Sequence, residues 1–367
     1  MTPFSLTIVF LEIACICGLI LVLMMIPGGP YGKQPKEWPF ISVLIAARNE
    51  EHNIIRCLNA ISRLVYPLDK IEILVGDDDS SDNTAKLVSK FIEEHPDLQI
   101  HLVHVKKNEG MAKGKANVLA QLARQAKGDF FLFTDADIAV PSTWAKTMVQ
   151  QFRPKDGIVT GITVMRNNSL FSRMQSIDWI FAMGIVKAFS RVHIPVTTMG
   201  NNMAIRREAY EQTGGFENIP FSVTEDFSIF KEVIKNGWRD HLVWDNKVLA
   251  VSEPMPNFQS MLVQRKRWMK GALQLPFMVK AVLLLQAIYY PAIIYLFFIA
   301  PGLTLFLAVL KMLFQTYFIS GRIHHINRND LLGIVPFYEL YAVLWSLLLL
   351  VYFIIPTGIR WKGRKYS

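Results

Sequence analysis

Acidic residues gather directly after a short apolar run at residues 71–76. Asp77, Asp78 and Asp79 are adjacent, and Asp82 follows three positions later. Adjacent carboxylates repel one another, so a fold keeps them only where other groups compensate. A solvated turn with Asp82 as a helix N-cap accounts for Asp82, but a turn rarely needs three further acids. We therefore expect a carboxylate here to accept hydrogen bonds from a nucleoside, through uracil N–H or ribose hydroxyls.

A second acidic pair, Asp135 and Asp137, follows an apolar run at residues 130–133. In an extended segment, residues two apart point to the same side, so both carboxylates can face one hard cation. Mg²⁺ and Mn²⁺ prefer carboxylate and phosphate oxygens. The pair therefore predicts a cation that bridges to a diphosphate and neutralises charge on a leaving group, although an isolated Asp-x-Asp also occurs in polar loops.

Thr224, Glu225 and Asp226 stand at the start of a predicted helix that runs to about Lys235. Helix capping explains them if Thr224 is the cap and the two acids complement the helix dipole. The alternative is chemical, because one of the acids can remove a proton from an acceptor hydroxyl as a general base. This segment alone leaves both interpretations open.

The fourth group is the run Gln264, Arg265, Lys266, Arg267 and Trp268. On a helix, Gln264, Arg267 and Trp268 share one face, so we expect them to point into a site while Arg265 and Lys266 point away. Arg binds phosphate oxygens in a fork. Trp stacks on a sugar or base, or anchors at a membrane interface. The alternative is a basic juxtamembrane stretch attracted to anionic lipid.

These groups need a scaffold that brings distant segments together, and residues 40–135 supply one. Short β-rich apolar runs alternate with helical stretches, which is typical of a largely parallel sheet with helices on both faces. Ligands bind such sheets at the carboxyl ends of the strands, where the acidic groups stand. The expected strands are residues 41–47, 71–76, 101–105 and 130–134, and the expected helices are residues 50–64, 82–94 and 112–127.

Apolar sequence at both ends predicts membrane segments. Residues 4–26 are long enough to cross a bilayer. We expect an uncleaved anchor rather than a signal peptide, because no basic stretch precedes this segment and no small-residue cleavage site follows it. The C-terminal candidates are residues 281–299, 302–320 and 331–355. Three such spans would put the basic tail opposite a cytoplasmic domain, against the positive-inside rule. An interfacial or re-entrant segment between residues 276 and 320 would remove this conflict.

We therefore expect an anchor at residues 1–30, an α/β catalytic domain at residues 38–275, and a membrane region at residues 276–367 with two to three transmembrane helices and a basic tail. The 367 residues are 51% hydrophobic and carry a formal net charge of +9, which suits nucleic acid, an anionic membrane or a phosphorylated substrate. Part of the charge adjoins the membrane spans and no stacking motif is present, which argues against nucleic acid. The three cysteines form no disulfide or metal pattern. We expect an integral protein of the cell inner membrane with a cytoplasmic catalytic domain.

Taken in order, the four groups resemble glycosyltransferase family 2, the superfamily of cellulose-synthase-like and hyaluronan-synthase-like enzymes. The resemblance covers about residues 39–276. It implies a GT-A fold, a nucleotide-diphosphate-sugar donor and inversion at the anomeric carbon. The chain departs from the family at Asp79, where glycine is usual. Residues 361–366 are similar to the ending of some membrane-bound, lipid-glycosylating relatives.

The resemblance also implies a role for each matching residue. Asp226, with Glu225 beside it, is the base. Asp135 and Asp137 hold Mg²⁺ or Mn²⁺ together with the diphosphate. The implied donor-binding residues are Ala46, Arg48, Glu50, Asp77, Asp78, Lys115, Asp135, Gln264, Arg267 and Trp268.

Three functions are compatible with this sequence. The first is transfer of one sugar to a membrane lipid hydroxyl, the second is processive polysaccharide synthesis on a growing glycan, and the third is a non-catalytic membrane scaffold. Gln-x-x-Arg-Trp is common in processive members, which favours the second. The few spans after this motif favour the first, because a polymer channel needs a larger bundle or a partner. The complete set of acids argues against the scaffold, so we expect an inverting enzyme with a lipid acceptor.

Overall fold

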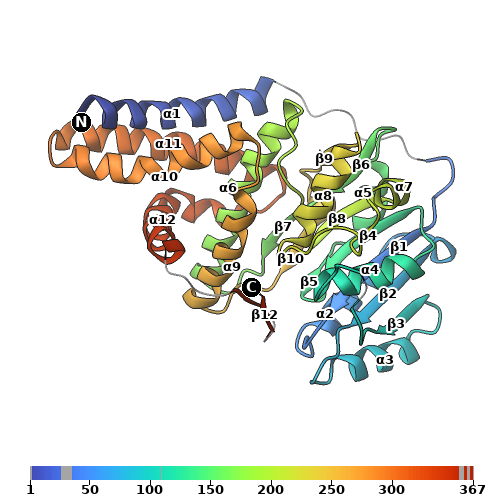
Figure 1. Cartoon of the computed structure of the whole chain (residues 1–367). Helices are drawn as coiled ribbons and strands as arrows, with labels where there is room; N and C mark the ends of the chain where they lie inside the picture. Colours follow the sequence, from blue (N-terminus) through green and yellow to red (C-terminus); the bar gives the residue numbers. More distant parts are fainter. Residues whose placement is uncertain (1, 26–34, 109, 355–358, 362–363, 367) are drawn as a thin grey trace.

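The computed structural model describes residues 2–25, 35–108, 110–354, 359–361 and 364–366. An α/β part and a helical part lie next to each other (Figure 1). The main sheet of the α/β part has the strand order β3-β2-β1-β4-β8-β6-β9. β1 to β4 pair in parallel, β8 runs antiparallel to β4 and β6, and β9 is parallel to β6. The mixed, mostly parallel sheet predicted from the sequence is confirmed. Its strands are β1 (Ile41–Ala47), β2 (Ile71–Asp77), β3 (Ile100–His104), β4 (Phe130–Asp135), β6 (Asp156–Thr160), β8 (Asn202–Arg206) and β9 (Arg239–Leu242).

Helices cover both faces of this sheet, as predicted. Along β1, Val43 and Ile45 enter the core under α2, α3 and α5, whereas Leu44 enters the opposite core under α4, α7 and α8. The expected helix at residues 112–127 starts later, at Lys115, because Gly114 has a φ of +55°, which is not helical. The helices are α2 (Ile54–Ile61), α3 (Thr84–Glu94), α4 (Lys115–Gln125), α5 (Trp144–Gln150), α7 (Arg207–Gln212) and α8 (Glu225–Lys235).

A small second sheet with the order β5-β10-β7 lies against the main one. Asn202, at the start of β8, is fully buried and joins the two sheets. Its amide donates to the carbonyls of Ile162 (2.8 Å) and Val248 (2.9 Å), and its oxygen accepts from the Trp144 indole (2.8 Å). A buried amide satisfied on both sides fixes the relative position of the segments that it links. The strands of this sheet are β5 (Ile138–Ala139), β7 (Ile162–Met165) and β10 (Leu249–Ser252).

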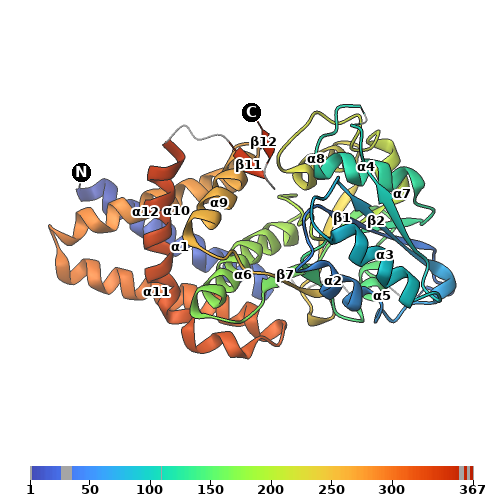
Figure 2. The same cartoon turned by 90° about the horizontal axis from the view of Figure 1, so that it is seen from below.

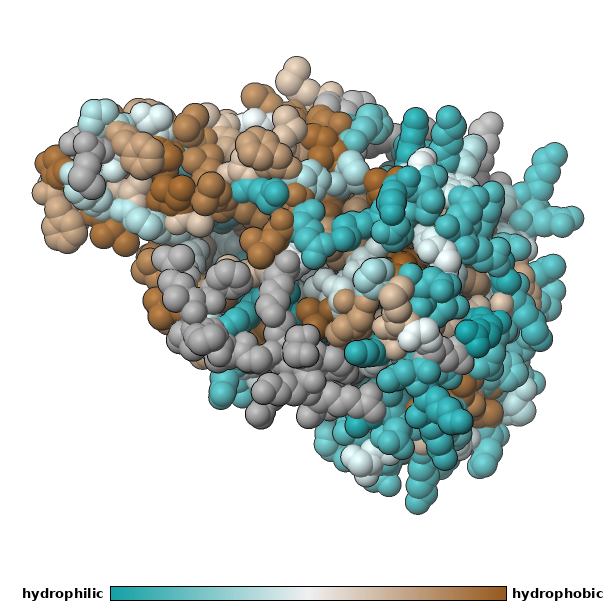
Figure 3. Space-filling model, viewed as in Figure 1, coloured by the Kyte–Doolittle hydropathy of each residue, from teal (hydrophilic) through white to brown (hydrophobic). Residues whose placement is uncertain are grey.

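The helical part contains the predicted membrane segments. Four segments of the described chain are long and apolar enough to cross a membrane: Pro3–Met25, Phe277–Phe297, Pro301–His325 and Asn329–Leu349. Figure 3 shows the apolar surface over the bundle of α1, α10 and α11, and a hydrophilic surface over the α/β part. Residues 26–30 of the expected anchor lie outside the described residues. The helices are α1 (Thr2–Met25), α6 (Leu170–Arg191), α9 (Phe258–Ala272), α10 (Phe277–Phe297), α11 (Pro301–His325) and α12 (Tyr338–Ile354).

Helix α12 runs across the other membrane helices. Figure 1 shows α12 end-on while α1, α10 and α11 are seen from the side, and Figure 2 shows α12 along its length. Its aromatic face packs on α9, where the Tyr341 hydroxyl lies 3.6 Å from Met261 Sδ and Trp345 stacks on Phe258 at 5.5 Å. Its opposite face carries exposed leucines, including Leu340. Such an arrangement suits a helix that lies in the membrane interface.

The chain after α12 lies close to the α/β part. After α12, the chain forms an antiparallel pair, β11 (Ile359–Trp361) and β12 (Arg364–Tyr366), which lies beside α9 at the border of the α/β part. The segment between residues 276 and 320 forms the long helices α10 and α11, so an interfacial segment there stays a prediction. Among the described helices of this part, α12 is the one that runs crosswise. Residues 362–363 of the terminal motif lie outside the described residues.

A buried ion pair holds this crosswise helix to the bundle. Lys311 of α11 is fully buried and pairs with Glu339 of α12, whose carboxylate also accepts from Gln315 at 2.8 Å. Glu12 of α1 is buried nearby, within electrostatic reach of both charges. Ionisable side chains inside a membrane bundle are costly unless they are paired, so this cluster specifies how α11 and α12 meet.

Helix α6 was not predicted, although it joins the two parts. It packs on β7 in the α/β part and on α11 in the bundle, where the Phe181 and Phe318 rings lie 5.8 Å apart. Ser169 and Ser172 start it with a reciprocal capping box. In the usual capping box the third helical residue is Glu or Gln. Because Ser172 stands there, the sequence gave no clear indication that a helix begins at this point.

Candidate active site

The predicted acidic groups meet at the carboxyl ends of β1, β2 and β4. The parallel register places Ala46 of β1 beside Gly76 of β2 and Asp135 of β4. One residue later, Ala47 lies beside Asp77. A cavity of about 1150 Å³ extends over this edge. All but one of the predicted site residues line it: Ala46, Arg48, Glu50, Asp78, Lys115, Asp135, Asp137, Glu225, Asp226, Gln264, Arg267 and Trp268.

The exception is Asp77, which is buried at the end of β2. Its Oδ2 atom lies 3.7 Å from Nδ1 of His104 and accepts a 3.4 Å hydrogen bond from the backbone N–H of Ser80. Asp77 thus holds the turn after β2, while Asp78 faces the cavity. Its predicted contact with the nucleoside stays a prediction.

The turns after β1 and β2 interlock, and this explains the unusual Asp79. Arg48 donates to the carbonyl of Asp78, and Asn49 accepts at its side-chain oxygen from the backbone N–H of Ser81 at 2.9 Å. Asn49 and Asp79 have φ angles of 52° and 55°. Asn and Asp are the side chains that tolerate this left-handed region best, so Asp79 fills a position that glycine ordinarily occupies.

Lys115, at the first turn of α4, connects the acids of two separate segments. Its Nζ atom lies 2.6 Å from Asp135 Oδ1 and 2.9 Å from Glu225 Oε1. Burial alone would lower the pKa of Lys115, but the two carboxylates raise this pKa well above its ordinary value. A permanent ammonium therefore stands between the Asp-x-Asp turn and the start of α8.

Asp226 and Glu225 lie side by side in different electrostatic environments. Asp226 accepts hydrogen bonds from the backbone N–H groups of Gly200 (2.9 Å) and Phe227 (2.8 Å). Burial and the neighbouring Glu225 charge raise the pKa of Asp226 to about 6. Burial also disfavours the charge of Glu225, but Lys115 outweighs this effect and the pKa of Glu225 is lowered. Environments that separate two carboxyl pKa values in this way assign Asp226 as the better base near neutral pH.

Two further observations concern the start of α8. The Thr224 side chain makes no capping hydrogen bond, so the capping interpretation of this residue is not supported. Gly200 was not predicted as a site residue, yet a Cβ atom there would lie 2.7 Å from Asp226 Cβ. Only glycine lets the backbone approach closely enough to donate to Asp226. The Gly200–Asn202 turn carried a weak loop signal in the sequence but no sign of this contact.

Helix α9 places Gln264, Arg267 and Trp268 on the cavity wall, as their shared face predicted. The prediction for Arg265 was wrong, because Arg265 also lines the cavity. Lys266 does point away, but it is buried rather than free to meet lipid. Its Nζ atom donates to the Tyr352 carbonyl of α12 at 3.3 Å. The aromatic face of α12 thus draws Lys266 to the opposite side of α9.

Arg265 belongs to a polar network that the sequence did not reveal. It pairs with Asp178 of α6, and the Tyr338 hydroxyl of α12 donates to the same carboxylate at 2.8 Å. The Arg265 guanidinium lies 4.5 Å from the Trp268 ring centre, and Trp268 meets Trp179 edge-to-face at 5.1 Å. Residues far apart in sequence therefore hold Trp268 against the cavity.

The two acids of the Asp-x-Asp turn can hold a divalent cation if substrate phosphates and water supply the remaining metal ligands. Asp135 and Asp137 both line the cavity. Within the described residues, no group of three or more His, Cys, Asp or Glu side chains is suited to a metal ion. Mg²⁺ is commonly held by one or two carboxylates plus substrate phosphates and water. The side chains present match that pattern.

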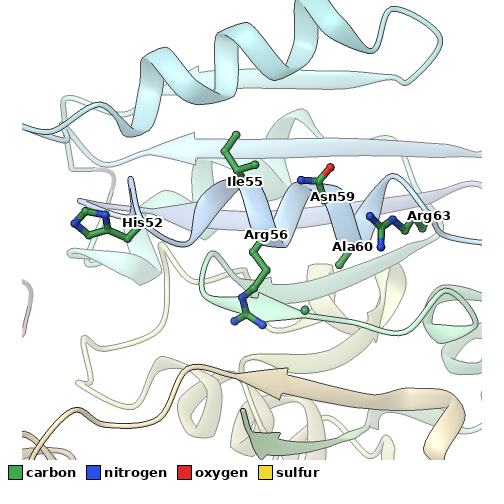
Figure 4. Close-up of a pocket in the computed structure, with 7 residues that line it drawn as sticks. His52, Ile55, Arg56, Asn59, Ala60 and Arg63 are labelled. Atoms are coloured by element: carbon green, nitrogen blue, oxygen red, sulfur yellow. The ribbon is translucent and has the colours of Figure 1, made fainter. Parts of the chain in front are cut away.

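A second hollow, of about 520 Å³, lies over α2 and shares no lining residue with the larger cavity (Figure 4). Figure 4 shows Arg56 extending from α2 toward the neighbouring strands. Its guanidinium donates to the Val251 carbonyl at 3.2 Å and pairs with Glu253 at 3.2 Å. Arg56 therefore joins α2 to β10 and its following turn, and we assign no chemistry to this hollow.

Comparison with known proteins identifies the family. Residues 6–367 match glycosyl transferase family 21. The chain belongs to this family. This membership confirms the predicted resemblance to the family 2 superfamily of glycosyltransferases.

Curated relatives of this family 21 protein match more than half of its length. The probable glycosyltransferase YdaM of Bacillus subtilis is 30% identical over 245 residues, which are 64% of this chain and 56% of the relative. The poly-β-1,6-N-acetyl-D-glucosamine synthase of Staphylococcus epidermidis is 26% identical over 243 residues, which are 63% of this chain and 54% of the relative. The chain spans about half the length of these relatives.

A solved structure confirms the GT-A fold over nearly the whole chain. The mannosyltransferase PcManGT from Pyrobaculum calidifontis, in complex with GDP-Man and Mn²⁺, superposes with a TM-score of 0.58. It is 22% identical, and the match covers 93% of this chain and 98% of PcManGT.

Proposed function

We propose that the enzyme transfers one sugar, with inversion, from a UDP-sugar or related nucleotide donor to the hydroxyl of a membrane lipid. The reaction takes place at the cytoplasmic face of the inner membrane. The observation that carries this proposal is the extent of the cavity. Asp135 and Asp226 line it, and so do Leu283 of the membrane helix α10 and Leu349 of α12. One cavity thus serves the donor chemistry and the membrane.

The donor binds over the carboxyl ends of the strands. Asp78 and Arg48 face the nucleoside, and Lys115 and Arg267 face the diphosphate, where their fixed charges offset its negative charge. A divalent cation held by Asp135 and Asp137 would supply further charge neutralisation on the leaving group. The GDP-Man and Mn²⁺ of PcManGT support this assignment.

Asp226 acts on the acceptor. Its carboxylate accepts the proton of the lipid hydroxyl while the oxygen attacks the anomeric carbon from the face opposite the diphosphate. The bond to the diphosphate breaks in the same displacement, so configuration inverts and no covalent sugar–enzyme intermediate forms. Gly200 and Phe227 hold the carboxylate in place through their backbone N–H groups. Glu225 keeps Lys115 beside the diphosphate through its ion pair.

The second candidate is processive polysaccharide synthesis, which the name of the Staphylococcus epidermidis relative favours. In the described bundle, α1, α10 and α11 pack on one another through buried side chains that include Ile16, Tyr290 and Leu307. Side chains therefore fill the space between these three helices and leave no channel among them. This packing supports the lipid acceptor.

The test incubates membranes containing the enzyme with a panel of radiolabelled nucleotide sugars and Mg²⁺ or Mn²⁺. Organic extraction separates glycolipid from polymer. Label in the organic phase that depends on Asp226 supports the proposal. Label that appears only in a solvent-insoluble polymer would overturn it in favour of processive synthesis.

A further inference from the structure

We propose that the acceptor reaches the site sideways from the bilayer, between α10 and α12, with one acyl chain held in an apolar extension of the cavity. We call this extension the membrane limb and define it by Met183 and Val186 of α6, Val279 and Leu283 of α10, and Leu349 of α12. The inference rests on the proposed lipid acceptor and specifies how that acceptor binds.

One face of α10 lines the limb from its buried inner end to the surface of the protein. Val279, Leu283 and Gln286 all line the cavity, and their i, i+4, i+7 spacing puts them in one stripe along the helix. Val279 is only 3% exposed and packs with Met183 in one apolar cluster. Leu283, one turn further along, keeps 38% of its surface exposed. The stripe therefore begins at a closed inner wall and reaches the surface at Leu283.

Helix α10 is long and apolar enough to cross a membrane, and with α10 in that position the opening at Leu283 faces the bilayer. Its neighbour Leu284 is 61% exposed but does not line the cavity, since it lies on a different face of the helix. Leu349 of the crosswise helix α12 completes the limb. A lipid chain that moves from the bilayer into such a limb exchanges one apolar environment for another. The acyl chain of the acceptor therefore does not have to pass through water on its way to the site.

The same cavity also has a polar part. Asp178, Arg265 and Tyr338 line the same cavity and form the hydrogen-bonded network described above. They come from α6, α9 and α12, the helices that connect the bundle to the catalytic part. An acyl chain among the apolar side chains of the limb and a hydroxyl among the polar side chains match this difference in polarity. This geometry selects an amphiphile with its hydroxyl close to the start of its apolar chain.

The experiment uses the full chain in phosphatidylcholine vesicles with a diacylglycerol that carries a diazirine on one acyl chain. After irradiation, mass spectrometry maps the labelled residues. Met183 is the reporter, because it is 6% exposed and lines the limb from inside. The test variant is Leu283→Trp, which fills the opening. The matched control is Leu284→Trp, the same change one residue away on the outer face.

We expect labelling at Met183 in the unmodified protein and in Leu284→Trp, and loss of that labelling to background in Leu283→Trp. No labelling at Met183, or equal labelling in the two variants, would overturn the lateral route. Thermal unfolding of both variants shows whether they are folded. The readout does not require sugar transfer, so it is independent of the proposed function. If Met183 is labelled as expected but no lipid is glycosylated, the route stands and the proposed acceptor falls.

Discussion

The pH dependence of catalysis tests the assignment of Asp226 most directly. A base must be deprotonated to act, and the pKa of Asp226 is about 6 because of burial and the Glu225 charge. From this value, about nine tenths of the Asp226 side chains are ionised at pH 7 and about one tenth at pH 5. We therefore expect kcat/KM to fall by roughly tenfold between pH 7 and pH 5. A carboxyl group with an ordinary pKa would keep nearly full activity at pH 5.

The substitution Asp226→Asn should remove this pH-dependent activity. General-base catalysis typically contributes about 10²–10⁴-fold in rate, so kcat should fall within that range. The amide can accept at only one of its two atoms, so the N–H group of either Gly200 or Phe227 loses its acceptor. An unsatisfied buried donor costs about 1–3 kcal/mol of stability. Thermal unfolding must therefore accompany the kinetics.

The assay measures initial rates with a saturating donor at fixed ionic strength, and donor affinity separately by calorimetry. Asp245→Asn is the control. The Asp245 carboxylate also accepts a hydrogen bond from a backbone N–H group, that of Lys247 at 2.8 Å, but Asp245 does not line the cavity. It should lose stability without losing the pH profile. A flat profile from pH 5 to pH 7, or near-normal kcat in Asp226→Asn, would refute the base assignment.

Three further predictions concern the cation, the diphosphate and the topology. Asp137→Ala should abolish activity that depends on Mg²⁺ or Mn²⁺, and full turnover of this variant in excess EDTA would contradict the cation site. Arg267→Ala should lower kcat/KM at least roughly tenfold, because a charge-assisted hydrogen bond contributes about 1.5–3 kcal/mol; a change below twofold would remove Arg267 from the site. In a cysteine-free background, Lys365→Cys in β12 and Asp97→Cys in the α/β part should react with an impermeant thiol reagent from the same membrane side. Labelling from opposite sides would show that α12 crosses the bilayer.

Much of the donor side could be predicted because it depends on local patterns. The acids at residues 77–79 and 135–137 follow apolar strands, and parallel strands end at one edge of a sheet. Their meeting at the carboxyl ends of β2 and β4, the two neighbours of β1, follows from that rule. The spacing of Gln264, Arg267 and Trp268 predicted their common face for a similar reason. Arg265 could not be predicted, because its direction depends on Asp178, which lies in a helix that gave no clear sequence signal.

The sequence by itself determined the class of the protein, since four ordered motifs and apolar ends indicate a membrane-bound glycosyltransferase of the family 2 superfamily. Only the tertiary structure gives the two acids at the start of α8 different environments. Asp226 and Glu225 are adjacent carboxyl groups of similar intrinsic acidity, and Lys115, from another helix, separates their pKa values. The same holds for α12, whose apolar sequence allows it to span a membrane. Its contacts with α9 and the buried pair Lys311–Glu339 set its direction, crosswise to α1, α10 and α11.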